Sequence, residues 1–242
     1  PLVYLEGYHS GYKGIGNGFW RWDATSTLAT NRATVKPTAA SSGRYIPVFY
    51  NGEVDITRFG ARHNVTDNTA VADAWSMAQN NSLRDNVLFV PGGNYQITGT
   101  LANTAMSAVD STVGTRFLLR GINKGFGNSN NGPYGASRLT MVTDNTPICS
   151  VTGPGNIIEG ITLAFSNVQT GSNTNGICIY HNQVSDLSRS RFENLHLKNG
   201  AYGYYSYQGS VYQPNNKWEN ILIDRYTQTA WYGGAPGTTT KL

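Results

Sequence analysis

The sequence predicts an all-β chain built mainly from a parallel β-solenoid. Charged residues make up only 13% of the chain, whereas it contains 28 glycines and 15 tyrosines, a composition that favours turns and stacked strands. A weak repeat of about 27 to 30 residues contains short strand patterns with no helix between them, which is typical of solenoids. Only one segment has a helical pattern. These observations predict a small β-rich N-terminal head, one capping α-helix and a parallel β-helix.

We expect three parts along the chain. Residues 1–50 form the head, where closely spaced glycines supply turns and the aromatic residues between them supply the burial that a small domain needs. Residues 51–101 form the beginning of the β-helix with its capping helix. Residues 102–242 form the first coils, and we expect further coils beyond Leu242.

The helix is expected over residues 70–79, with Asp67 or Thr69 accepting hydrogen bonds from its first backbone N–H groups. A strand that ends in a turn is expected before it, over residues 53–61. The helix pattern consists of apolar residues at i, i+3, i+4 and i+7, namely Val71, Ala74, Trp75 and Ala78.

Each repeat of the solenoid contains two strand patterns. The first is expected at residues 148–151, 176–180 and 203–207, and the second at residues 158–163, 192–197 and 218–223. Asn194 and Asn220 occupy one position in successive coils, with Gly160 in the coil before. Asn and Gly tolerate the left-handed backbone conformation, so this position predicts a stacked bend.

Charge, cysteines and histidines exclude several function classes. The net charge of +4 is scattered, so we expect no nucleic-acid partner, and no apolar run is long enough for membrane insertion. Cys149 and Cys178 fall at equivalent positions of adjacent coils, and we expect two reduced core residues. His181 and His196 have no carboxylate at a fixed offset. We expect no metal and no cofactor.

Residues 56–61 (ITRFGA) and 65–70 (VTDNTA) resemble the motif that begins the β-helix in the pectate-lyase-like superfamily. The usual form there is FGAxGDGxTDDTxA, followed by a helix, a strand and a PxGxY turn. Residues 90–95 (VPGGNY) fit that turn with one extra residue. Residues 62–64 make the motif one residue short and lack its Asp-Gly pair, which changes a turn without changing the expected fold.

Upstream, residues 5–8, 18–26 and 42–46 resemble a segment that precedes this motif in bacteriophage tailspikes and tail fibres. The two motifs in this order resemble the N-terminal part of a tailspike. The resemblance implies a right-handed β-helix, a homotrimer, contact with other phage tail proteins, and a place in the virion tail after synthesis in the bacterial cytoplasm. It also implies a depolymerase that binds capsule, exopolysaccharide or O-antigen and cleaves it by hydrolysis or β-elimination.

Two alternatives stay open. The first alternative to the depolymerase is a non-catalytic structural or adhesive part of a tailspike, in which catalysis lies in other coils or is absent. The second alternative is a bacterial secreted β-helix polysaccharide lyase. Lyases of that kind usually hold Ca²⁺ with clustered aspartates. The repeat region contains only Asp186 and Asp224, so the lyase ranks last.

Glu159, Glu193 and Glu219 occupy one position in successive coils and are the catalytic candidates. Glycoside hydrolysis requires two carboxyl groups about 5 to 9.5 Å apart, and stacked strands lie about 5 Å apart. Arg191 and Lys217 precede two of these glutamates by two residues, on the same strand face. A ladder of ion pairs that holds the coils together is therefore the alternative.

Tyr205, Tyr207, Tyr212 and Trp231 are the candidates for substrate binding. Side chains alternate along a strand, so about half of this aromatic cluster faces outward. Exposed aromatic rings stack on sugar rings, and their hydroxyl groups bond glycan oxygens. Burial between subunits of a trimer would use the same residues equally well.

Overall fold

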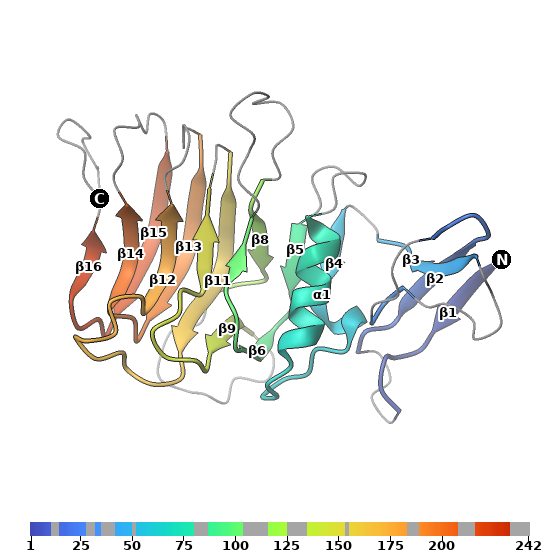
Figure 1. The fold of residues 1–242 in the computed structure, drawn as a ribbon, viewed down its shortest axis with the longest axis horizontal. Helices are drawn as coiled ribbons and strands as arrows, with labels where there is room; N and C mark the ends of the chain where they lie inside the picture. The colour runs from blue at the N-terminus through green and yellow to red at the C-terminus, as the bar shows by residue number, and fades with distance from the viewer. Residues whose placement is uncertain are drawn as a thin grey trace.

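The computed structural model describes residues 1–10, 15–27, 32–34, 42–49, 52–79, 87–103, 116–124, 135–152, 155–182, 189–207 and 216–232 of the 242-residue chain. These residues form a three-stranded antiparallel sheet, one α-helix and two parallel sheets (Figure 1). The predicted fold class, a β-rich head followed by a capping helix and a parallel β-helix, is confirmed. The boundaries proposed between the three parts stay a prediction.

The head sheet consists of β1 (Leu2–Leu5), β2 (Gly18–Asp23) and β3 (Arg44–Pro47). Strand β2 lies in the middle and pairs antiparallel with both neighbours. Its aromatic residues pack across the strands, with ring centres 5.0 Å apart between Trp22 and Tyr45.

Parallel pairing stacks all the other described strands into two sheets that run side by side along the molecule (Figure 1). The apolar side chains between them form one continuous core. The eight-stranded sheet contains β4 (Glu53–Asp55), β5 (Val87–Val90), β6 (Gly93–Ile97), β8 (Leu118–Gly121), β9 (Ser137–Met141), β11 (Ile157–Phe165), β13 (Arg191–Lys198) and β15 (Lys217–Asp224). The five-stranded sheet contains β7 (Leu101–Ala102), β10 (Cys149–Val151), β12 (Ile177–Asn182), β14 (Tyr202–Tyr207) and β16 (Thr229–Tyr232).

The strand predicted over residues 53–61 ends earlier than expected. After β4, the residues Ile56–Phe59 form a short 3₁₀ helix, η1. The Asp55 carboxylate accepts hydrogen bonds from the backbone N–H of Thr57 at 2.8 Å and from its hydroxyl at 2.7 Å. Gly60 then adopts a left-handed conformation with φ 92°. The aspartate side chain gives the backbone an alternative to strand pairing, so pairing stops at Asp55.

Helix α1 (Asn68–Ala78) begins two residues before the predicted range and ends one residue before it does. The predicted cap is confirmed, because the Asp67 carboxylate accepts a hydrogen bond from the Ala70 N–H at 3.2 Å. The predicted apolar stripe is buried. It packs on β4, β5 and η1, at the N-terminal end of the solenoid (Figure 1).

The same helix protects the edge of the five-stranded sheet. Strand β7 is the last strand of that sheet, and the indole N–H of Trp75 donates to the Ala102 carbonyl in β7 at 2.7 Å. The Trp75 ring also packs on Phe117 at 4.5 Å between centres. Unpaired edges of sheets invite association with other chains, and a covering helix prevents it.

The predicted stacked bend is confirmed. Gly160, Asn194 and Asn220 all have left-handed backbones, with φ of 65°, 53° and 54°. The Asn220 side-chain amide donates to the Asn194 side-chain carbonyl at 2.7 Å. The bend divides β11, β13 and β15 into a first and a second half, each with its own outer face.

The two cysteines are free and buried, but they are not equivalent. The register pairs Cys149 with Ile179, so Cys178 is one residue out of step. The register is set by the burial of apolar side chains in the core, and it does not require residues of the same type to lie side by side. The predicted equivalence was therefore wrong by one residue.

Candidate functional site

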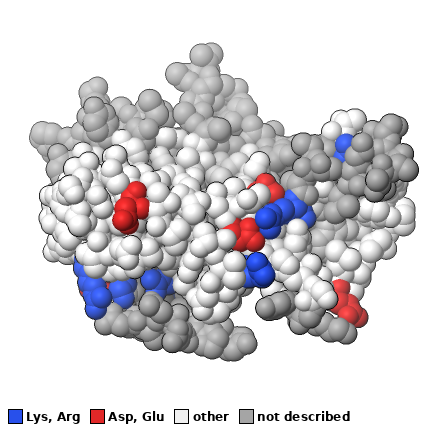
Figure 2. Space-filling view, turned by 60° about the horizontal axis from the view of Figure 1, so that its bottom comes forward, with Lys and Arg blue, Asp and Glu red and all other residues white. Residues whose placement is uncertain are grey.

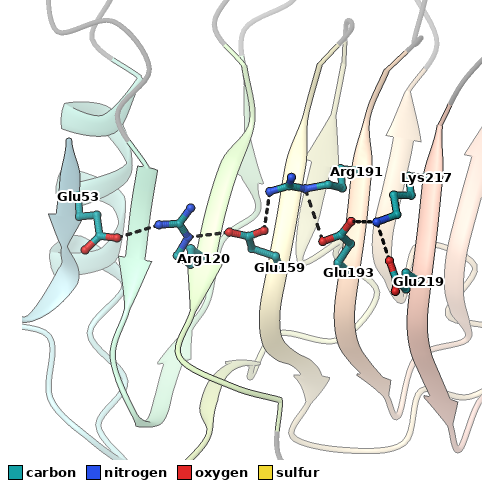
Figure 3. Close-up of polar contacts among 7 residues, drawn as sticks. All are labelled: Glu53, Arg120, Glu159, Arg191, Glu193, Lys217 and Glu219. Carbon is teal, nitrogen blue, oxygen red and sulfur yellow. Dashed lines mark hydrogen bonds and ion pairs between the residues drawn. The ribbon is translucent and has the colours of Figure 1, made fainter. Parts of the chain in front are cut away.

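A ladder of alternating carboxylates and cations crosses the outer face of the eight-stranded sheet (Figure 3). The register places Glu159 beside Glu193 and Glu193 beside Glu219. Arg191 and Lys217 each contact a glutamate on their own strand and one on a neighbouring strand, whereas Arg120 contacts glutamates on two other strands. In order, the charged ladder consists of Glu53, Arg120, Glu159, Arg191, Glu193, Lys217 and Glu219.

Most contacts in the ladder are short. Arg120 binds Glu53 at 2.9 Å and Glu159 at 2.6 Å, and Arg191 binds Glu159 at 2.8 Å. The contact of Arg191 with Glu193 is longer, at 3.6 Å. A cation therefore lies between each neighbouring pair of carboxylates.

The last rung continues the pattern. The Lys217 ammonium lies 2.7 Å from Glu193 and 2.6 Å from Glu219. Hydrogen bonds to Glu193 and Glu219 raise the pKa of Lys217. The hydrogen bond from Lys217 lowers the pKa of Glu219. A hydrogen bond to Glu159 likewise raises the pKa of Arg120.

The predicted carboxylates are thus brought together, with the predicted Arg191 and Lys217 between them. A general acid in glycoside hydrolysis needs a raised pKa, whereas the pKa of Glu219 moves down. The catalytic role of Glu159, Glu193 and Glu219 stays a prediction. Glu53 and Arg120 were missed because they precede the recognisable repeat.

A tyrosine platform lies on the outer face of the five-stranded sheet. Tyr180 in β12 pairs in register with Tyr205 in β14, and their ring centres are 5.9 Å apart. The Tyr202 ring lies 5.0 Å from the Tyr205 ring, nearly at right angles to it. All three residues are partly exposed. The predicted Tyr205 is therefore the centre of an aromatic surface, to which Tyr180 adds a member that the sequence analysis missed.

For two of the other aromatic candidates, Tyr207 and Trp231, the structure describes the backbone alone. Tyr207 and Trp231 belong to β14 and β16, where the register puts them beside Asn182 and Tyr204. Their side chains, and the whole of Tyr212, lie outside the described residues. Their predicted role in binding stays a prediction.

The two histidines have different surroundings. His181 lies in the core, its Nδ1 is 2.6 Å from the Tyr204 hydroxyl, and burial lowers its pKa to about 3. His196 faces the other side of the solenoid wall, with Nε2 3.9 Å from an Asp224 oxygen. Sequence spacing does not reveal this contact, because Asp224 lies on the next strand, where the register puts it beside Lys198.

The part of the chain that the structure describes contains no cluster of three or more His, Cys, Asp or Glu side chains arranged to hold a metal ion. Its helices include none that is long and apolar enough to span a bilayer.

The fold is similar to that of several solved structures. The tailspike protein gp49 of Acinetobacter baumannii bacteriophage Fri1, a capsular polysaccharide depolymerase, matches with a TM-score of 0.58 and 15% identity, over 99% of this chain and 47% of its own. The enzymatically active domain of bacteriophage CBA120 tailspike protein 2 matches with a TM-score of 0.59 and 12% identity, over 92% and 31%. The gp42 tailspike of Acinetobacter phage vb_AbaP_AS12 matches with a TM-score of 0.53 and 13% identity, over 91% and 40%.

The likeness is one of fold. It confirms the predicted resemblance to tailspike β-helices at that level. The chain spans less than half the length of each of these three tailspikes. No family model matches the chain, and no curated protein is similar to it in sequence.

Proposed function

We propose that this chain is part of a phage tailspike that binds and depolymerises a polysaccharide of the bacterial cell surface. The tyrosine platform of Tyr180, Tyr202 and Tyr205, on the outer face of a tailspike-like β-helix, carries the proposal. Aromatic faces stack on sugar rings, and phenol groups bond their hydroxyls. The Fri1 tailspike, which has a similar fold, is a capsular polysaccharide depolymerase.

Cleavage proceeds by glycosidic hydrolysis or by β-elimination. Glu159, Glu193 and Glu219 stack on adjacent strands, which lie about 5 Å apart, and hydrolysis requires carboxyl groups about 5 to 9.5 Å apart. We nevertheless favour a structural role for them. Each contacts at least one cation at 2.8 Å or less, which favours the ionised form. A ladder with cations between the carboxylates also offsets the repulsion that stacked like charges would produce.

Adhesion without cleavage is the second candidate. This function is favoured because the tyrosine platform and the carboxylates lie on different sheets. The platform is on the five-stranded sheet, and the carboxylates are on the eight-stranded sheet. A binding surface that is separate from a pair of carboxylates can hold a glycan without reacting with it.

For assembly we propose a homotrimer in the virion tail. Strand β1 is the outer strand of the head sheet, and its four residues Leu2, Val3, Tyr4 and Leu5 are 60%, 38%, 50% and 40% exposed. A soluble monomer rarely exposes such a run on a free sheet edge, and a second copy of the chain would cover it. Sedimentation at monomer mass across micromolar concentrations would count against this proposal.

The function is tested by incubating this chain, and the full-length protein, with capsular, exopolysaccharide and O-antigen preparations. New reducing ends indicate hydrolysis, and unsaturated uronates indicate elimination. Retention of a glycan without either product supports adhesion. If no bacterial surface glycan is retained or cleaved, the proposal is wrong.

A further inference from the structure

The five-stranded sheet that carries the tyrosine platform has uncharged strands. The described strands β7, β10, β12, β14 and β16 contain no Asp, Glu, Lys or Arg, and their one histidine, His181, is buried in the core. Figure 2 shows charged side chains in a few separate groups with wide uncharged surface between them, and those groups belong to other elements. The charged ladder lies on the eight-stranded sheet instead.

A row of side chains crosses the outer face of the five-stranded sheet from coil to coil. The register puts Ala102 beside Ser150 and Ser150 beside Tyr180. It then puts Tyr180 beside Tyr205. These four residues are partly or fully exposed, whereas the residues directly before and after each of them on its strand are buried. Each coil therefore adds one residue to the row, at the strand spacing of about 4.8 Å.

The two tyrosine rings in this row have a spacing that suits a chain of sugars. The ring centres of Tyr180 and Tyr205 are 5.9 Å apart, and their planes differ by 39°. One sugar unit of an extended glycan is about as long as this separation. The Tyr202 ring packs 5.0 Å from the Tyr205 ring at 74°, which holds that ring in place before any ligand arrives. A ring that is already held loses little freedom on binding.

The chemistry of this surface favours sugars without charge. The face of an aromatic ring is negative, so it attracts the slightly positive C–H bonds on the apolar face of a sugar and repels anions. A carboxylate or phosphate placed on the row would lose contact with water, and these five strands supply no cation to replace it. An uncharged sugar has only hydroxyl groups to satisfy, which can stay in contact with water at its edge.

We infer that Tyr180 and Tyr205 bind two successive uncharged sugar units of the polysaccharide, which lies along the solenoid axis with one unit for each coil. The inference rests on the proposed function and adds the substrate class and the direction of the glycan. The row carries it, because the exposed side chains of successive coils lie in register and are uncharged.

The substrate class is tested by calorimetry on the full chain with two probes of the same length and linkage. These are β-1,4-mannohexaose and β-1,4-hexamannuronate, which differ in whether a hydroxymethyl or a carboxylate group is attached to each ring. We expect mannohexaose to bind about tenfold more tightly. Equal affinity, tighter binding of the uronate or no binding of mannohexaose would overturn the inference.

The direction of the glycan is tested by a gain of affinity. Ser150→Tyr adds a third ring to the row, one coil before Tyr180, and should strengthen mannohexaose binding about tenfold. Mannobiose should gain little, because it covers only two coils at a time. The control is Val168→Tyr, at a position that is 46% exposed and outside these strands, which should strengthen neither. Equal effects of the two variants would contradict a glycan that follows the row.

Loss of a ring distinguishes the glycan from a second subunit as the occupant of the row. Tyr180→Ala should weaken mannohexaose binding about tenfold and leave sedimentation unchanged. If it changes sedimentation and not affinity, the row is a contact between subunits and the inference is wrong. If the protein retains acidic bacterial glycans as well as neutral ones, the inference is wrong and the proposed function stands. If it retains no bacterial surface glycan, the proposed function itself has failed.

Discussion

The guanidinium carbon of Arg58 lies 4.6 Å from the centre of the Trp20 ring, so a charge at the beginning of the solenoid is buried against the core of the head. The same guanidinium donates to the carbonyl of Val48 at 2.5 Å and to that of Phe19 at 2.8 Å. An added methyl group at Gly18 would meet it at 2.6 Å. Arg58 therefore joins the head to the beginning of the solenoid, as does the ion pair between Arg32 and Asp67 at 3.2 Å.

Replacement of this cation should loosen both parts. Arg58→Ala should lower the free energy of unfolding by about 3 kcal/mol, because two partly buried carbonyls lose a charged donor. Arg21→Ala, at an exposed position of β2, is the control and should stay within about 0.5 kcal/mol of the wild type. Chemical denaturation measures both. Equal stability of the two variants would show that the head does not depend on Arg58.

The charged ladder makes opposite predictions for its two roles. If it is structural, as we propose, the double variant Glu193→Gln/Glu219→Gln of the full-length protein should cleave its glycan at the wild-type rate. If one of these carboxylates is the acid or base, a single change should slow cleavage about 10² to 10⁴-fold. The assay is product formation, with circular dichroism to check folding. A folded but inactive variant would refute the structural role.

The ladder should also weaken in acid. The pKa of Glu219 is lowered from its ordinary value of 4.5 by Lys217. A carboxylate whose pKa is lower in the folded chain stabilises it above the unfolded pKa, and this contribution is lost as pH falls through the folded pKa. The difference in Tm between wild type and Glu219→Gln should therefore be present at pH 7 and disappear below about pH 4. A difference that persists at pH 3 would contradict the ion pair as its source.

The bend offers a comparison between two glycines. A methyl group at Gly160 would lie 2.8 Å from the Gly121 carbonyl oxygen, in a backbone with φ +65°. Gly160→Ala should therefore cost about 2 kcal/mol in unfolding free energy. Gly135→Ala meets nothing within 4 Å and should change stability little. Similar losses for both variants would mean that the bend is not a constraint.

The platform should carry glycan affinity. Tyr205→Ala removes the central ring and should weaken binding about tenfold, since loss of one stacked aromatic residue costs about 1 to 1.5 kcal/mol. Tyr226→Ala removes an aromatic residue that is 47% exposed elsewhere and serves as the control. Titration with the glycan that the protein retains gives both affinities. Identical values would place the binding surface somewhere else.

The contacts of residues that repeat in sequence could be predicted, because residues one period apart lie side by side in neighbouring coils. The bend at Asn194 and Asn220 and the pairs made by Arg191 and Lys217 follow from such a period. Glu53 and Arg120 escaped prediction because they are 67 residues apart and belong to coils of irregular length.

Strand β9 escaped prediction for a related reason. It begins at Ser137, directly after a stretch rich in Gly, Asn and Ser that shows no strand pattern. Strand β9 forms because its apolar residues Leu139 and Met141 are buried in the core beside β6 and β11. Long-range pairing decides this strand, and no local pattern reveals it.

The hydrogen bond from Trp75 to Ala102 makes the two ends of the solenoid different. One end is closed by a side chain that occupies the edge of β7, so a further coil has no place to add there. Whole coils can therefore be duplicated or deleted without disturbing the head only among the later strands or after them. There each coil contacts only its neighbours. Changes in the length of the proposed glycan-binding surface, and hence in the number of sugars it would span, can accumulate in those coils while the junction with the head stays fixed.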